Sequence, residues 1–285
     1  MKLVLNVDSA VDPRRLVDDI ERALRAKHLV LPRRALTIGN VWFAPMASYV
    51  EGMGIGVKLV GIYPSASPPV KALAALIDPN TGEVLALADA TKLTGWRTAA
   101  ASALALRLIG VRPKVIGVVG AGVQAQYHIR VFREVFAPES IMLYSRSRAK
   151  EVAGMLGVKY AGLDEVLSAD VVIAATNSAE PVVKGAKLGR GSVVISVGAP
   201  RPVRELDEDV KRRAGCALVD SPEAVEETDD VAGVEAVPLE DLLAGRRSCA
   251  FKEIALYKSV GYAPFDTAAV YHLYTRAEGV EVELS

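Results

Sequence analysis

The 285-residue sequence contains little cysteine, no excess of either charge and no long apolar run. Cys216 and Cys249 stand far apart and outside any CxxC or Cys/His pattern, so we expect two reduced thiols and neither a disulfide nor a zinc site. Lys plus Arg and Asp plus Glu number 34 each, which argues against a nucleic-acid partner. No apolar stretch approaches the roughly 18 residues of a membrane helix, and the apolar N-terminal run, which ends at Asn6, is too short for a signal peptide. We expect a cytoplasmic protein with no membrane partner.

Histidine is scarce as well. His28, His128 and His272 lie far apart in the sequence, with no Cys or carboxylate at ligand spacing. Structural or surface roles are therefore expected for all three, and no metal site is predicted.

The first part of the chain combines one amphipathic helix with short β-like runs. Apolar residues recur at helical spacing between Val11 and Lys27, and Asp12-Pro13 is a typical helix start. The runs that follow are separated by Pro, Gly, Asn and Ser, which predicts an antiparallel sheet with hairpins. These runs are Ala35 to Phe43, Gly54 to Tyr63, Val70 to Ile77 and Val84 to Ala88.

A helix with many small residues comes next. Thr94 is expected to cap it, and Pro113 ends the helical pattern. Strands and helices then alternate, which predicts a parallel sheet with covering helices. The acidic segment from Glu223 to Asp230 is interpreted as a solvated helix face. The alternating segments are Val115–Val119, Gln124–Phe136, Ser140–Tyr144, Arg148–Leu156, Leu163–Leu167, Val171–Ala175 and Ser192–Val197.

The predicted fold class is therefore α/β with two domains. A dinucleotide-binding domain over 113–255 is inserted into a second α/β domain, which is formed by residues 1–112 and 256–285. The segment after 255 is too short to fold alone, so we expect it to rejoin the first part.

A glycine turn follows the first strand of the inserted domain. Gly120-Ala121-Gly122-Val123-Gln124-Ala125 opens a helix within a βαβ unit, as the Rossmann fingerprint requires. Gly120 can make the tight turn, Gly122 lets the backbone approach a pyrophosphate, and Ala125 permits close helix packing. The helix N-terminus then supplies amide donors to the phosphates. This context predicts a bound dinucleotide, whereas the pattern alone is weak.

The end of the second strand distinguishes NAD from NADP. Ser145-Arg146-Ser147 stands roughly 20 residues past the glycines and carries no carboxylate for a ribose hydroxyl. Arg146 and Ser147 can instead hold a 2′-phosphate. NADP(H) is thus favoured over NAD(H), with a pair of surface arginines as the alternative interpretation.

Two blocks resemble the ornithine cyclodeaminase/mu-crystallin family. They are the segment from Leu93 to Ala103 and the glycine turn, and the likeness continues over nearly the whole chain. The resemblance implies a Rossmann domain inserted into a dimerising substrate domain, hence a homodimer. It also implies hydride transfer at the α-carbon of a small amino or imino acid, as in archaeal-type alanine dehydrogenase and ketimine reductases.

The resemblance further assigns site residues. Arg34, Lys58 and Arg97 match the family's carboxylate-binding cations, with Arg33 as the alternative to Arg34. Guanidinium groups bind a carboxylate bidentately and orient the α-carbon. Lys58 stands in an apolar run, where a lysine is costly to bury without an anion. The residues expected to bind the cofactor are Gly120, Gly122, Val123, Gln124, Ser145, Arg146, Ser147, Thr176, Val197 and Ser259.

The sequence departs from the cyclodeaminases at one point. They carry an aspartate in a Gly-Gly-Asp block where this chain has Gly198-Ala199-Pro200. Asp207 follows shortly, but it is interpreted as a helix N-cap before Val210. Without that carboxylate, reduction of a 2-imino acid or cyclic ketimine carboxylate is favoured over conversion of ornithine to proline. A non-catalytic NADPH-dependent binding protein is the other alternative, and the substrate's side chain is not predicted.

Overall fold

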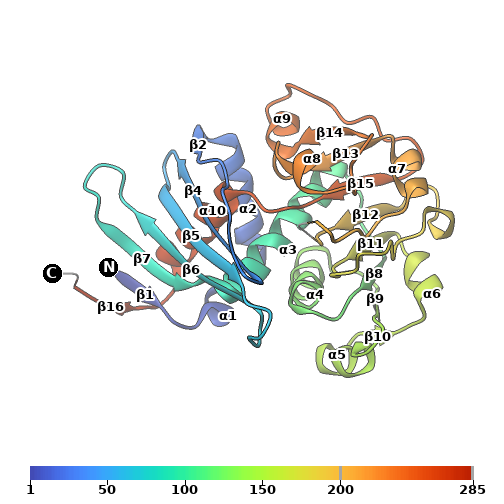
Figure 1. The fold of residues 1–285 in the computed structure, drawn as a ribbon, viewed down its shortest axis with the longest axis horizontal. Coiled ribbons are helices and arrows are strands. Elements are labelled where there is room, and N and C mark those ends of the chain that lie inside the picture. Colours follow the sequence, from blue (N-terminus) through green and yellow to red (C-terminus); the bar gives the residue numbers. More distant parts are fainter. Residues whose placement is uncertain (199–200, 284–285) are drawn as a thin grey trace. The chain divides into compact units, whose positions relative to one another are not determined.

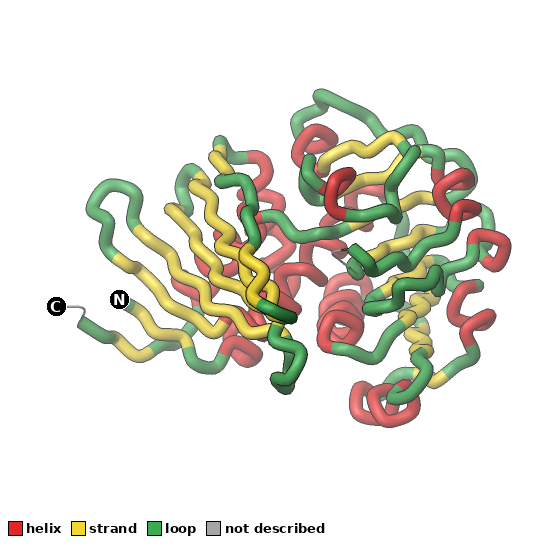
Figure 2. The backbone as a smooth tube through the Cα atoms, in the orientation of Figure 1, coloured by secondary structure: helices red, strands yellow, loops and turns green. Residues whose placement is uncertain are grey.

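The computed structural model describes residues 1–198 and 201–283. The contacts within the chain divide it into two compact units (Figures 1 and 2). Unit 1 consists of residues 1–100 and 262–285, and unit 2 of residues 101–261. The boundaries expected from the sequence, 113 and 255, both lie inside unit 2.

Unit 1 is built on a largely antiparallel sheet with the strand order β16-β1-β7-β6-β5-β4-β2, and β3 pairs with β4. Only the β1–β7 pair is parallel among the described strands of this sheet. Of the long central strands, β4 has five β-branched or aromatic residues, which suit a pleated surface, whereas β5 contains three glycines. The strands are β1 (Lys2–Val4), β2 (His28–Val30), β3 (Leu36–Ile38), β4 (Val41–Val50), β5 (Gly54–Ile62), β6 (Val70–Ile77), β7 (Val84–Asp89) and β16 (Val280–Glu281).

Helices cover one face of this sheet. α10 (Ala263–Arg276) packs on β4 and β5 and contacts α2 (Pro13–Arg25), while α1 (Val7–Ala10) is a single turn. The approach of α10 is close, because a Cβ on Gly56 would lie 2.2 Å from Thr267 Oγ1. Buried side chains on α2 face the same core, and Asp12 caps that helix as expected.

The opposite face of the sheet, called here the outer face, is apolar and partly exposed. The side chains on β5 alternate, so Lys58 points to the helical face and Leu59 to the outer face. Leu59 and Leu73, paired across β5 and β6, are 40% and 45% exposed. The other apolar side chains of the outer face include Phe43, Tyr49, Val57, Ala75, Leu85 and Leu87, and the charged Lys71 and Asp89 lie on the same face beside them.

Unit 2 contains a fully parallel sheet with the order β10-β9-β8-β11-β12-β15-β13-β14. The order reverses between β8 and β11, which is the switch point of a doubly wound sheet. Its strands are β8 (Val115–Val119), β9 (Ser140–Tyr144), β10 (Lys159–Tyr160), β11 (Val171–Ala174), β12 (Val193–Ser196), β13 (Cys216–Val219), β14 (Glu235–Pro238) and β15 (Ala255–Lys258).

Helices connect these parallel strands. α3 (Ala90–Ile109) leads the chain from unit 1 into unit 2. The remaining helices are α4 (Val123–Phe136), α5 (Ala149–Leu156), α6 (Leu163–Leu167), η1 (Gly185–Lys187), α7 (Glu208–Ala214), α8 (Ala224–Glu227) and α9 (Leu239–Leu243). In the part of the chain that the structure describes, none of the helices combines the length and apolar character required to cross a membrane.

Most predicted elements agree with the structure. The run from Ala35 to Phe43 does not, because a turn at Gly39 and Asn40 divides it into the antiparallel strands β3 and β4, and β4 continues to Val50. The start of α3 differs as well. Thr94 is not its cap, because the helix begins four residues earlier at Ala90. The Thr94 hydroxyl donates a hydrogen bond to the Ala90 carbonyl at 2.7 Å, a bond that threonine can make inside a helix. The expectation that Asp207 is an N-cap is confirmed, since its carboxylate accepts from the Val210 amide.

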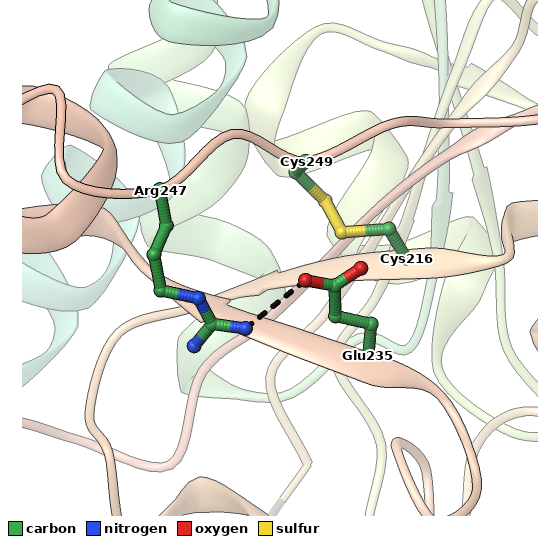
Figure 3. Close-up of a disulfide and its surroundings, with 4 residues drawn as sticks. All are labelled: Cys216, Glu235, Arg247 and Cys249. Atoms are coloured by element: carbon green, nitrogen blue, oxygen red, sulfur yellow. Dashed lines mark hydrogen bonds and ion pairs between the residues drawn. A yellow bond between two sulfur atoms is a disulfide. The ribbon is translucent and has the colours of Figure 1, made fainter.

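The prediction of two reduced thiols is wrong, because Cys216 and Cys249 form a disulfide (Figure 3). Cys216 begins β13, and Cys249 lies in the loop before β15, with a separation of 33 residues. Backbone bonds from Lys252 and Glu253 to the end of α7 bring that loop beside β13. Glu235 and Arg247 form an ion pair close to the disulfide, at 3.1 Å. Sequence spacing alone could not show this proximity.

The interpretation of residues 223–230 as a solvated helix face is also wrong. Only Ala224–Glu227 are helical, and Asp230 at the end of the segment is fully buried. Asp230 accepts a hydrogen bond from the Lys258 ammonium at 2.7 Å, which stabilises the buried charge.

Candidate functional site

The glycine turn of unit 2 has the geometry of a phosphate-binding loop. Gly120 follows β8 with φ of +120°, and a Cβ there would lie 2.3 Å from the Ala175 carbonyl oxygen after β11. Only glycine tolerates this conformation and this contact. Gly122 is the N-cap of α4, and open space surrounds its Cα. The turn therefore lies at the switch point, where doubly wound sheets bind nucleotides.

The first turn of α4 has backbone amides that can donate hydrogen bonds to an anion. Within the described residues no side chain caps this end of the 14-residue helix. Its first amides therefore remain available, and the helix dipole adds a positive potential. Val123 is 43% exposed at this end, and Gln124 Oε1 is buried without a hydrogen-bond partner in the described chain. These features fit a pyrophosphate of a dinucleotide.

The loop after β9 carries the residues expected to distinguish NADP from NAD. Arg146 and Ser147 are exposed, and Ser145 Oγ accepts from the Arg148 amide. Arg148 pairs with Glu151 through two hydrogen bonds, of 2.7 and 3.1 Å. No ion pair involves Arg146 in the described part of the chain. Of these two arginines, Arg146 is therefore the one whose charge is not engaged by an acid.

A buried charged network supports the carboxyl edge of the sheet in unit 2. Glu205 accepts hydrogen bonds from the Thr176 amide and hydroxyl and from the Ser196 hydroxyl and the Gly198 amide. Lys258 donates to Ser196 and to Asp230. Both carboxylates are fully buried, and each is satisfied by several donors. The network fixes the loops after β11 and β12.

The other residues expected to bind the cofactor lie along this edge. Thr176 and Val197 are half-buried after β11 and β12. Ser259 is buried after β15 and donates to Asp220 at 2.7 Å, so its hydroxyl is already engaged. Ala199 and Pro200, where the cyclodeaminases have their aspartate block, lie outside the described residues.

Unit 1 contains a buried cluster of two cations and one acid. Lys58 on β5, Arg97 on α3 and Asp266 on α10 are 2%, 5% and 5% exposed. Asp266 Oδ1 accepts from Lys58 Nζ at 2.8 Å and from Arg97 Nε at 2.9 Å. Asp266 Oδ2 is buried with no hydrogen-bond partner among the described residues. Two of the predicted cations are thus brought together.

Burial and, to a smaller extent, the neighbouring Arg97 charge lower the pKa of Lys58, while Asp266 opposes both effects, and the resulting pKa is about 8. Arg33 also lowers this pKa through its charge, so it lies within electrostatic reach of Lys58. Arg33 is half-buried, whereas Arg34 is exposed. A lysine with a pKa near neutrality can exchange a proton at physiological pH.

Sequence reasoning did not assign Asp266. An acidic residue in the first turn of a helix is common, because it interacts well with the helix dipole. The informative signal was its apolar surroundings from Ala263 to Ala269, which require an ionised side chain to have a partner.

Two of the histidines have the structural roles expected for them. His128 is buried between the Gln124 carbonyl and the Ser102 hydroxyl, and burial lowers its pKa to about 4. His272 is buried between Asp19 and the Asp12 amide. Across residues 1–198 and 201–283 no group of three or more metal-binding side chains is found.

The doubly wound sheet with its glycine turn defines an α/β protein of the dinucleotide-binding class. The chain belongs to the ornithine cyclodeaminase/mu-crystallin family, whose model matches residues 1–281. This confirms the predicted family resemblance, and the structural similarities described next confirm the fold class.

Several known proteins are similar along most of the chain. The rat ketimine reductase mu-crystallin is 33% identical, over 90% of this chain and 95% of its own. The structure of Thermococcus litoralis Δ1-pyrroline-2-carboxylate reductase with NADH and L-proline has a TM-score of 0.89 and 30% identity, covering 99% and 100%. An archaeal alanine dehydrogenase dimer with bound NAD has a TM-score of 0.90 and 25% identity, covering 100% and 99%.

Proposed function

We propose that this protein is an NAD(P)H-dependent oxidoreductase that reduces the C=N bond of a 2-imino acid or cyclic ketimine carboxylate to an amino acid. The observation that carries the proposal is the buried pair of Lys58 and Arg97 in a chain with a dinucleotide-binding turn. Asp266 offsets only one of these two buried positive charges, and a second buried cation is costly unless it serves a further anion. The ketimine and pyrroline-2-carboxylate reductases among its relatives support the same reaction.

The side chains of unit 1 have separable tasks in this reaction. Arg97, with Arg33 or Arg34, binds the substrate carboxylate and so orients the imino carbon. Lys58 in its ammonium form gives a proton to the imino nitrogen, and solvent returns it afterwards. The nicotinamide of the cofactor supplies the hydride for the carbon. One hydride and one proton thus convert C=N to CH–NH.

The test is cofactor oxidation followed by absorbance at about 340 nm. We expect consumption of NADPH or NADH with a cyclic ketimine carboxylate or with pyruvate plus ammonia, and an amino acid as the product. Lys58→Met should lower kcat by at least about a hundredfold, as expected for loss of a general acid. Met155→Leu, on the surface of unit 2, is the matched control. A purified protein that oxidises neither cofactor with any of these substrates would contradict the proposal.

For the cofactor we propose NADP(H) over NAD(H), on the basis of Arg146. The solved relatives described above contain NADH or NAD, so the proposal rests on the loop of this chain and not on those structures. Arg146→Ala should lower the ratio of kcat/KM for NADPH to that for NADH by at least about tenfold, since a charge-assisted bond to phosphate is lost. Arg148→Ala is the control, because Glu151 already binds that guanidinium. Equal ratios in the two variants would contradict the preference.

Two other functions predict different products. An ornithine cyclodeaminase would release ammonia and form proline from ornithine without net consumption of cofactor. A non-catalytic binding protein would bind a small molecule and NADPH with no turnover. Measuring proline, ammonia and cofactor in the same reaction separates these alternatives from the reductase.

We also propose a homodimer joined through the outer face of unit 1. The partner would be a second copy, because this face presents rows of apolar side chains where a solvated sheet has polar ones. Leu59 and Leu73 lie at its centre. Leu59→Glu should give a monomer by light scattering, while the surface control Met155→Glu should not. A wild-type protein with the mass of one chain would refute the dimer.

A further inference from the structure

We propose that Asp266 is a positioning residue of the reaction, which holds Lys58 protonated and Arg97 correctly oriented for the imino acid. This inference rests on the proposed function. It concerns an acid that does not contact the substrate but acts through two cations that do, Arg97 at the carboxylate and Lys58 at the imino nitrogen.

The geometry is that of a single oxygen shared between two donors. Lys58 Nζ and Arg97 Nε lie 2.8 and 2.9 Å from the same Asp266 Oδ1. The three side chains come from β5, α3 and α10, so the contact fixes the relative placement of three elements of unit 1. Because Arg97 uses Nε, its two terminal nitrogens are not needed for this contact and can form a fork for a carboxylate.

The charges explain why an acid is required at this position. The ionisable and charged groups facing Lys58 are Arg97 from α3, Asp266 from α10 and Arg33 from the loop before β3. The strands beside Lys58 contribute the uncharged Met46 and Ala74. Without Asp266, the Lys58 ammonium would face the positive charges of Arg97 and Arg33 and would lose the carboxylate that opposes them. Lys58 is the one that would respond by losing its proton, since arginine stays charged.

The experiment compares Asp266→Asn with the wild type by two independent readouts. The first is an NMR titration of lysine labelled with 15N, in which Lys58 is assigned by its absence in Lys58→Arg. In the wild type we expect a pKa of about 8. In Asp266→Asn we expect this pKa to fall by at least about one unit, as for loss of an adjacent opposite charge. Asp18→Asn, on the exposed side of α2, is the matched control and should leave it unchanged.

The second readout is the pH profile of reduction. Activity needs protonated Lys58, so it declines as pH rises through the pKa of Lys58, and Asp266→Asn should move this decline to lower pH by the same interval. Asp266→Glu keeps the charge but displaces the oxygen. It should keep the Lys58 pKa within about half a unit while lowering kcat by about tenfold or more. It also provides the comparison if the Asn variant does not fold.

The outcomes are distinguishable. An unchanged Lys58 pKa in Asp266→Asn overturns the inference, whatever the activity, and so does full kcat in Asp266→Glu. If the Lys58 pKa shifts in Asp266→Asn but the wild-type protein has no reductase activity, the coupling between Asp266 and Lys58 is supported and the proposed function is refuted.

Discussion

The disulfide between Cys216 and Cys249 should make a large contribution to the stability of unit 2. The bond closes a loop of 33 residues that contains β13, α8, β14 and α9. When the bond is broken, the unfolded chain regains the entropy of that loop, and the chain-entropy relation gives about 3.7 kcal/mol at 25 °C. This is a sizeable fraction of the roughly 5–15 kcal/mol that stabilises a typical folded protein.

The perturbation is Cys249→Ser, because Cys249 is only half-buried and serine fits there without burying a hydroxyl group. Unfolding in urea is followed by far-UV circular dichroism and by tryptophan fluorescence. Trp42 and Trp96 both belong to unit 1, so the fluorescence monitors that unit separately. We expect the free energy of unfolding from circular dichroism to fall by about 3–4 kcal/mol. Reductant should produce the same loss in the wild type and none in the variant. A difference below about 1 kcal/mol would refute the reasoning.

Three further predictions concern other buried groups. Gly120→Ala should weaken cofactor binding by at least about tenfold in a fluorescence titration, since its Cβ would overlap the Ala175 carbonyl. The folded state lowers the pKa of His128 from 6.5 to about 4, so the unfolded state takes up the proton first. The free energy of unfolding should therefore keep the full contribution of His128 above pH 6.5 and fall by up to about 3 kcal/mol as the pH is lowered towards 4. Urea titrations at several pH values should find a smaller decrease in His128→Gln. Lys258→Met leaves two buried acids without their cation and should cost about 3–5 kcal/mol, seen as a lower Tm.

The strands of both units were predictable because their patterns are local. Val70–Ile77 and Val115–Val119 have the predicted bounds, as does the helix Leu163–Leu167. Alternation and turn residues are encoded within a few positions. The start of α3 was missed because threonine is a common helix cap, whereas in the structure the four residues before Thr94 already belong to the helix.

The parts of the site that depend on local sequence could also be predicted. The glycine turn was identified from its motif, and the cations were assigned by the resemblance to the family. Asp266 and the buried role of Asp230 were not, because each has a partner far away in the sequence. The disulfide was not predicted for the same reason. A charged or sulfur side chain shows its role only when the fold has placed its partner, and no spacing rule encodes that placement.

The contact between Arg97 and Asp266 also determines when, during synthesis of the chain, this charged cluster can form. The two residues are 169 positions apart, and the whole of unit 2 is translated between them. Residues 101–261 form one continuous stretch, so they can fold on the ribosome while unit 1 still lacks α10. During that interval Lys58 and Arg97 have been synthesised but Asp266 has not. The two cations are thus made early, and their cluster with Asp266 can be completed only after unit 2 has been made.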